Sequence, residues 1–175
     1  QPDEFDKVIL ASHADQSLEL LDSPDAEEAK LLSNFKYQKN LGTLHTDSSA
    51  MPKNKICWAS WNYRIKQDDK GKLAPRTLYW MNKLQNVSEE VDYFVSINGE
   101  DEVKPECVIK QVPFEHPLFD RPAVESQPGL RQLNQRSPGQ QVYFCGSYFK
   151  YGFHEDALNS AMDLCETILE RPLWN

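Results

Sequence analysis

The chain has 175 residues, 19 Lys plus Arg, 27 Asp plus Glu and a formal net charge of −8, which is room for one ordinary domain. Because no long basic run interrupts this acidic balance, we expect neither nucleic acid nor an anionic membrane surface as a partner. The longest apolar runs, such as Val8–Ala11, are too short to span a membrane, and the first residues lack the order of a signal peptide. We therefore expect a cytoplasmic protein.

The first elements are a short strand and a short helix. The β-rich run Val8–Ala11 is followed by a loop and has no strand partner nearby, which is typical of the end of a larger structure. Ser23 then has the character of a helix N-cap, with Pro24 at the first helical position and acidic residues in the first turn. A helix after Ser23 would have Ala29, Leu31 and Leu32 on its inner face.

From Lys36 to Val112 the hydrophobic period is two, which predicts a mostly antiparallel sheet. The β-rich runs cover residues 36–46, 56–65, 76–85, 92–98 and 107–112. Alternation along the second run places one set of side chains on one face, which we expect to be the core face. That set is Cys57, Ala59, Trp61, Tyr63 and Ile65.

The sequence pattern of the C-terminal third predicts a connector, a strand and a long helix. The connector is rich in Pro, Gly and Gln and predicts a short helix over about 122–133, interrupted near Pro128 and Gly129. Strand Gln141–Cys145, a glycine-containing loop and an amphipathic helix from Phe153 to about Leu169 complete the chain. The fold class is α+β: a mixed, largely antiparallel sheet of five to six strands with both flanking helices packed against it.

Cysteines and histidines are too scattered to indicate a metal site or a disulfide framework. The cysteines lie in apolar segments, which predicts buried free thiols and agrees with a reducing cytoplasm. They are Cys57, Cys107, Cys145 and Cys165. For His45, which ends a predicted strand beside Asp47, a surface hydrogen bond is favoured, and a place in a substrate pocket stays open. His154 lies in the first turn of the last helix, where the helix dipole favours a neutral ring.

Motifs of fixed spacing exclude three enzyme classes. The sequence contains no G-x-S-x-G nucleophile elbow, no G-x-x-x-x-G-K-[ST] P-loop and no H-E-x-x-H zincin motif.

Gly146 and Gly152 are the informative glycines, because they flank the turn into the last helix. Gly152 would leave the backbone N–H groups of Phe153, His154 and Glu155 uncovered, which favours an anion such as a phosphate or a reduced flavin. A glycine-capped core helix is the other interpretation, and spacing alone does not separate the two.

The segment "VYFCGSYFKYGFHEDALNSAM" resembles the C-terminal flavin-contacting segment of the flavin-containing amine oxidase family. "FDKVILASHADQSLELL", "LHTDSSAMP", "WASWNY", "YWMNKLQ" and "HPLFD" extend this resemblance over nearly the whole chain, to the predicted NAD/FAD-dependent oxidoreductases of that superfamily. The matching motif positions are Gly146, Gly152, Phe153, Glu155 and Ala157. The family's G-x-G-x-x-G fingerprint does not occur here, and Ser147 stands where the family often has an acidic residue.

The resemblance implies the C-terminal portion of a longer FAD-dependent oxidoreductase, with residues 1–175 as one domain. Residues 13–140 would form the substrate-domain-like part, and 1–12 and 141–175 would return to the FAD domain. The implied cofactor-binding residues are Gly146, Ser147, Gly152, Phe153, His154 and Glu155. The substrate-pocket candidates are His45, Trp61, Trp80, Tyr148 and Tyr151.

Partners and cofactor follow from the same resemblance. The expected partners are an N-terminal FAD-binding domain of the same protein and a small-molecule substrate, and a homo-oligomer is compatible with the chain. FAD would be held by the full parent protein and weakly or not at all by this chain, which alone would be inactive. The alternative is a noncatalytic binding or oligomerisation module derived from the same fold.

Overall fold

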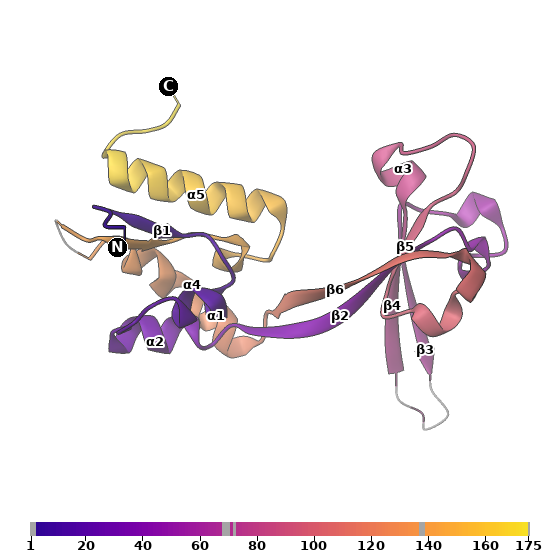
Figure 1. The fold of residues 1–175 in the computed structure, drawn as a ribbon, viewed down its shortest axis with the longest axis horizontal. Helices are drawn as coiled ribbons and strands as arrows, with labels where there is room; N and C mark the ends of the chain where they lie inside the picture. Colours follow the sequence, from indigo (N-terminus) through magenta and orange to yellow (C-terminus); the bar gives the residue numbers. More distant parts are fainter. Residues whose placement is uncertain (1–2, 68–70, 72, 137–138, 175) are drawn as a thin grey trace. The chain divides into compact units, whose positions relative to one another are not determined.

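The computed structural model describes residues 3–67, 71, 73–136 and 139–174. The chain divides into two compact units. We call Gln1–Gln38 with Pro117–Asn175 the terminal unit, and Lys39–His116 the central unit. The chain passes from one to the other within two strands, β2 (Lys36–His45) and β6 (Val108–Leu118) (Figure 1). The assignment of residues 13–140 to a substrate domain stays a prediction.

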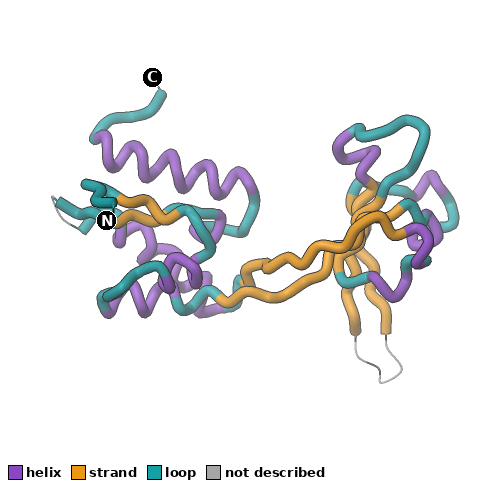
Figure 2. Tube along the Cα trace, in the orientation of Figure 1, coloured by secondary structure: helices purple, strands orange, loops and turns teal. Residues whose placement is uncertain are grey.

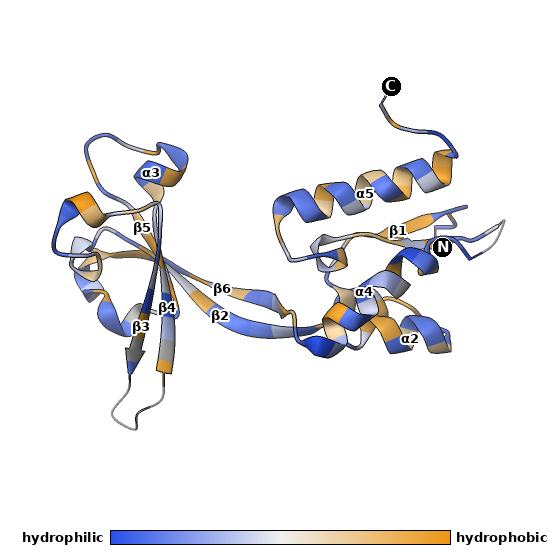
Figure 3. Cartoon of the chain, turned by 180° about the vertical axis from the view of Figure 1, so that it is seen from behind, coloured by the Kyte–Doolittle hydropathy of each residue, from blue (hydrophilic) through white to orange (hydrophobic). Residues whose placement is uncertain are grey.

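The terminal unit is built on a pair of parallel strands with helices on both faces. Its elements are β1 (Val8–Leu10), α1 (Ala14–Glu19), α2 (Ala26–Leu32), α4 (Arg121–Leu133), β7 (Val142–Phe144) and α5 (His154–Leu169). β1 pairs with β7 residue by residue, from Val8 opposite Val142 to Leu10 opposite Phe144. Figures 1 and 2 show α5 on one side of this pair and the other helices on the opposite side. β1 is apolar throughout, as its colour in Figure 3 shows.

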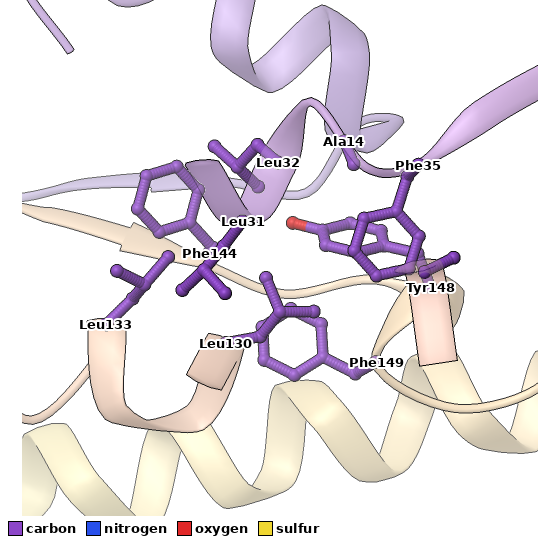
Figure 4. Packing of buried hydrophobic residues seen from close by; sticks show 10 residues of the cluster. Ala14, Leu31, Leu32, Phe35, Leu130, Leu133, Phe144, Tyr148 and Phe149 are labelled. Carbon is purple, nitrogen blue, oxygen red and sulfur yellow. The ribbon is translucent and has the colours of Figure 1, made fainter. Parts of the chain in front are cut away.

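Alternation along β7 explains the two helical layers. Tyr143 and Cys145 point to one side and pack with Leu164 of α5, whereas Phe144 points to the other side. Figure 4 shows the cluster around Phe144, with the Tyr148 ring beside the Phe35 ring. The buried members are Ala14, Leu31, Leu32, Phe35, Ala123, Leu130, Leu133, Phe144, Tyr148 and Phe149. This cluster is the main core of the terminal unit.

The central unit carries the five-stranded sheet, in the order β3-β4-β5-β2-β6. Its other strands are β3 (Trp61–Gln67), β4 (Leu73–Trp80) and β5 (Phe94–Ile97), and a short helix, α3 (Met81–Gln85), follows β4. The pairs β3–β4, β4–β5 and β5–β2 are all antiparallel. The predicted α+β class and the antiparallel sheet between Lys36 and Val112 are therefore confirmed.

The face of this sheet that forms the core is the opposite of the one expected. Met51, Leu78 and Phe94 form the buried cluster, with Trp58 and Trp80 packed against it. The predicted core side chains Trp61, Tyr63 and Ile65 are 58%, 57% and 58% exposed. The period-two pattern separates the two faces correctly, but both carry large apolar residues, so it does not tell which face is covered.

Some local predictions need correction. Residues 14–19 form α1 where a loop was expected. The strand Val8–Ala11 has no strand partner nearby in sequence, as expected, and pairs instead with the distant β7. The helix after Ser23 begins at Ala26, because the Asp25 carboxylate accepts the N–H groups of Glu27 and Glu28 and so becomes the N-cap. Both flanking helices were expected on the antiparallel sheet, but α2 packs in the cluster around Phe144 and α5 packs on β7.

Helix α4 is continuous through Pro128, where an interruption was expected. A Cβ on the neighbouring Gly129 would lie 2.8 Å from the Leu31 side chain, so this glycine allows α4 and α2 to pack closely.

The prediction that all four cysteines are buried free thiols is confirmed only in part. Cys145 is buried, and this burial raises the pKa of its thiol, but Cys57 is exposed and Cys107 and Cys165 are half-buried. All four thiols are free.

Candidate functional site

The loop between β7 and α5, together with the first turn of α5, holds the residues that the resemblance assigns to flavin binding. Gly146 lies two residues after the end of β7, with φ 154°, and its N–H donates to Ser160 Oγ at 2.8 Å. A Cβ at this position would lie 2.7 Å from the ring of Tyr148, which is 1% exposed. Gly146 is therefore explained by packing inside the fold, and the backbone approach of a ligand is not needed to account for it.

Gly152 also has an internal reason. Its φ is 89°, a region that favours glycine, and its N–H donates to the carbonyl of Ser147 at 3.1 Å. A Cβ here would lie 3.0 Å from the ring of Phe119. The loop thus turns sharply into α5 and packs against the residues before α4.

The first turn of α5 is only partly uncovered. The Asp156 carboxylate accepts the backbone N–H groups of Tyr151 and Phe153, each at 3.1 Å. The expectation that the Phe153 N–H is uncovered is therefore wrong. The N–H groups of His154 and Glu155 keep the orientation of the first helical turn, and their side chains are exposed. The carboxylates of Glu155 and Asp156 weaken the pull of this helix end on an anion.

The substrate-pocket candidates do not share one environment. In the terminal unit, Tyr148 is part of the core and its burial raises the pKa of its hydroxyl, whereas Tyr151 is 68% exposed. In the central unit, His45 is fully buried, Trp80 is half-buried and Trp61 is exposed. The structure brings together only His45 and Trp80, which both contact the cluster of Phe94.

His45 is fixed by hydrogen bonds at both ring nitrogens. Nδ1 accepts the backbone N–H of Asp47 at 3.2 Å, so in the neutral ring Nε2 carries the proton and donates to Ser96 Oγ at 2.8 Å. Burial lowers the pKa of His45, against the opposing effect of the Asp47 carboxylate. Because Nε2 carries the proton, His45 is not arranged as a general base toward Ser96. The favoured interpretation of His45, a structural hydrogen bond, gains support, but the residue is buried and not on the surface.

Asp47 continues this network into the loops. Its carboxylate accepts the N–H groups of Ser49 at 2.9 Å and Lys104 at 3.0 Å. Burial alone would raise the pKa of Asp47, but these hydrogen bonds lower it overall. Asp47 therefore ties the segment after β2 to the segment before β6.

Trp80 is also held by its neighbours. Its Nε1–H donates to the Asp92 carboxylate at 2.8 Å, and its ring packs edge-on against Trp58 with centroids 5.2 Å apart. The ammonium of Lys55 lies 4.9 Å from the Trp58 ring and 3.2 Å from Asp92. This arrangement stabilises the loops around α3 and does not by itself form a substrate wall.

A cavity of about 410 Å³ lies in the central unit. Among its lining residues, Trp61 was a predicted substrate-pocket residue, whereas Arg64, Arg76 and Ser96 were not singled out from the sequence. What brings Arg64 and Arg76 together is their opposed position on two adjacent antiparallel strands. A single sequence does not give the register of these strands, so it could not identify this pair.

No protein-family model matches the chain, and no curated protein matches it in sequence. The described residues include no group of three or more His, Cys, Asp or Glu side chains placed to hold a metal ion. Within the same part of the chain, every helix is too short or too polar to cross a bilayer.

Proposed function

We propose that this chain is the C-terminal, substrate-binding and flavin-contacting portion of an FAD-dependent oxidoreductase of the amine oxidase type. The observation that carries the proposal is the parallel pair β1–β7, which lies between helices and leads through a glycine loop into α5. Parallel strands with helices on both faces are typical of α/β nucleotide-binding sheets. Val8 and Ile9 of β1 are still exposed here, 39% and 48%, so further strands could cover them. We infer that strands of an FAD-binding domain extend this pair.

The order of elements supports the same proposal. Within the described residues β1 and β7 pair only with each other, and the chain between them leaves the terminal unit to form an antiparallel sheet. A nucleotide-binding unit interrupted by a β-rich substrate unit would have this order. The central unit, with its cavity, would then carry the substrate.

The fit of FAD to the residues of the loop is partial. The N–H groups of His154 and Glu155 and the exposed rings of Tyr151 and Phe153 would hold the flavin end. Asp156 already accepts two neighbouring N–H groups, which reduces the room for a negative group. When bound, FAD supplies the hydride acceptor. The residues of this chain would orient that group.

The test uses the longer protein that the proposal requires. The coding sequence upstream of Gln1 should contain a glycine-rich βαβ start, and the purified longer protein should carry stoichiometric flavin absorbance. Phe153→Ala, at the proposed contact, should lower the flavin content, whereas Leu158→Ala, an exposed position farther along α5, should not. An unrelated upstream domain, or a longer protein without flavin, would instead favour a noncatalytic binding or oligomerisation module.

A further inference from the structure

The cavity of the central unit lies over the covered face of its sheet. Its volume of about 410 Å³ is within the range of small-molecule sites, about 300–1,000 Å³. Its lining includes Met51, Asn62, Arg64, Arg76, Leu78 and Ser96. The sheet register places the last five of them on one face, because Arg64 lies opposite Arg76, Asn62 opposite Leu78, and Leu78 opposite Ser96.

Two arginines face each other directly across β3 and β4. Like charges in directly opposed positions are unfavourable unless anions lie between or beside them. Arg64 is paired with Glu102, whose side chain is 12% exposed. Arg76 is paired through Nη2 with Asp101 Oδ1 at 3.0 Å, but that aspartate is 59% exposed. An exposed ion pair is weak, so a ligand can take the place of Asp101 at Arg76.

Two further donors on this face have no acceptor among the residues that the structure describes. Nε of Arg76 is buried and makes no hydrogen bond within the described part of the chain. Ser96 Oγ accepts the Nε2–H of His45, so its own hydrogen is left to donate. Buried donors are normally paired, and these two lie on neighbouring strands at the same cavity.

The rest of the lining is neutral or already satisfied. Met51 and Leu78 present apolar surface, and both belong to the buried cluster. The Asn62 amide donates to the carbonyls of Ala59 and Leu78, and its oxygen accepts the Ala59 N–H. The cavity thus combines unpaired donors at one place with an apolar wall beside them.

We propose that this cavity binds a small organic carboxylate with an apolar body. The two oxygens of a carboxylate match the planar fork of the Arg76 guanidinium, and one of them can also accept the Ser96 hydroxyl. The apolar body lies against Met51 and Leu78. This is the cavity that the proposed function assigns to the substrate, and to that extent the proposal rests on that function. The binding itself uses only residues of the central unit, so it can be tested without flavin.

The experiment is calorimetric titration of the purified chain, without flavin, with sodium hexanoate. Hexylammonium chloride, which carries the opposite charge, and sodium phosphate, which lacks the apolar body, serve as matched probes. We expect saturable binding of hexanoate and no saturation with either of the others. Saturation with phosphate at the same concentrations, or none with hexanoate up to about 10 mM, would overturn the proposal.

Variants locate the binding. Arg76→Gln should weaken hexanoate binding by at least about tenfold, and Ser96→Ala by a few-fold. Asp101→Asn should tighten it, because it removes the competing anion; this variant also keeps the test decisive if Arg76→Gln does not fold. Arg121→Gln, an exposed arginine paired with Glu125 in the terminal unit, should have no effect. Equal binding by wild type, Arg76→Gln and Asp101→Asn would place hexanoate elsewhere and contradict the proposal.

Discussion

The backbone N–H of Asp47 donates to Nδ1 of His45 at 3.2 Å, and this bond fixes the histidine as the tautomer protonated at Nε2. A second bond joins Nε2 to Ser96 Oγ, and the ring lies against Phe94 with centroids 5.5 Å apart. A doubly protonated ring would lose the bond from Asp47, because Nδ1 would no longer accept. The neutral ring is thus part of the folded structure.

The first prediction concerns pH. Burial lowers the pKa of His45 below its usual value of 6.5, so the unfolded chain takes up the proton more readily than the folded chain. The stabilisation is complete above about pH 6.5 and is lost as the pH falls toward the lower folded pKa. Denaturant unfolding at about pH 7.5 and about pH 5.5 should show a larger loss of stability for the wild type than for His45→Gln. An equal pH response of the two proteins would contradict this role of His45.

The second prediction concerns Gly146. Alanine at this position would combine an unfavourable φ with a Cβ 2.7 Å from the buried Tyr148 ring, so Gly146→Ala should cost about 2–4 kcal/mol of unfolding free energy. Gly139, with φ 99° and nothing within 4 Å of the position that a Cβ would take, is the matched control. Gly139→Ala should cost about 1 kcal/mol, from the backbone alone. Chemical denaturation measures both, and similar costs would show that the contact with Tyr148 relaxes.

The third prediction concerns Ser160 on α5. Its hydroxyl accepts the Gly146 N–H at 2.8 Å and donates to the Ala157 carbonyl at 2.7 Å. Ser160→Ala would leave the Gly146 N–H without its partner and should cost about 1–3 kcal/mol. Thr167→Ala, which removes a similar hydroxyl bonded to the Asp163 carbonyl on the same helix, should cost less than about 0.5 kcal/mol. Thermal or urea unfolding distinguishes them, and a Thr167 cost as large as that of Ser160 would contradict the assignment.

The fourth prediction tests which face of the central sheet is the core. Leu78 is 8% exposed, and Leu78→Ala should cost about 2–5 kcal/mol. Ile65 on the opposite face is 58% exposed, and Ile65→Ala should cost at most about 1 kcal/mol. Urea unfolding curves give both values. A reversed order would mean that the face of Trp61, Tyr63 and Ile65 is buried.

The fifth prediction is that the chain alone binds FAD weakly or not at all. The first turn of a helix stabilises an anion by about 1 kcal/mol, whereas micromolar affinity requires about 8 kcal/mol. Asp156, which occupies two N–H groups beside this turn, lowers the attraction further. Titration of the chain with FAD, followed by flavin fluorescence, should show no stoichiometric quenching. Quenching at micromolar protein would mean that these residues form a complete cofactor site.

The sequence by itself determined the elements with strong local signals. The antiparallel runs after Lys36 follow from a hydrophobic period of two, and α5 follows from its apolar stripe and the turn at Gly152. The positive φ angles at Gly146 and Gly152 were also predictable, because only glycine takes such φ values readily. These features depend on neighbours in the chain.

Only the tertiary structure decided which surfaces are buried and which side chains meet. The pairing of β1 with β7 joins residues more than a hundred positions apart, and no local pattern specifies such a partner. Both faces of the central sheet carry aromatic residues, so the loop segment around Met51 determines which face becomes the core. The same register places Arg64 opposite Arg76 and His45 beside Ser96. Periodicity gives the alternation of side chains along one strand, whereas contacts between strands depend on the register and on what covers the sheet.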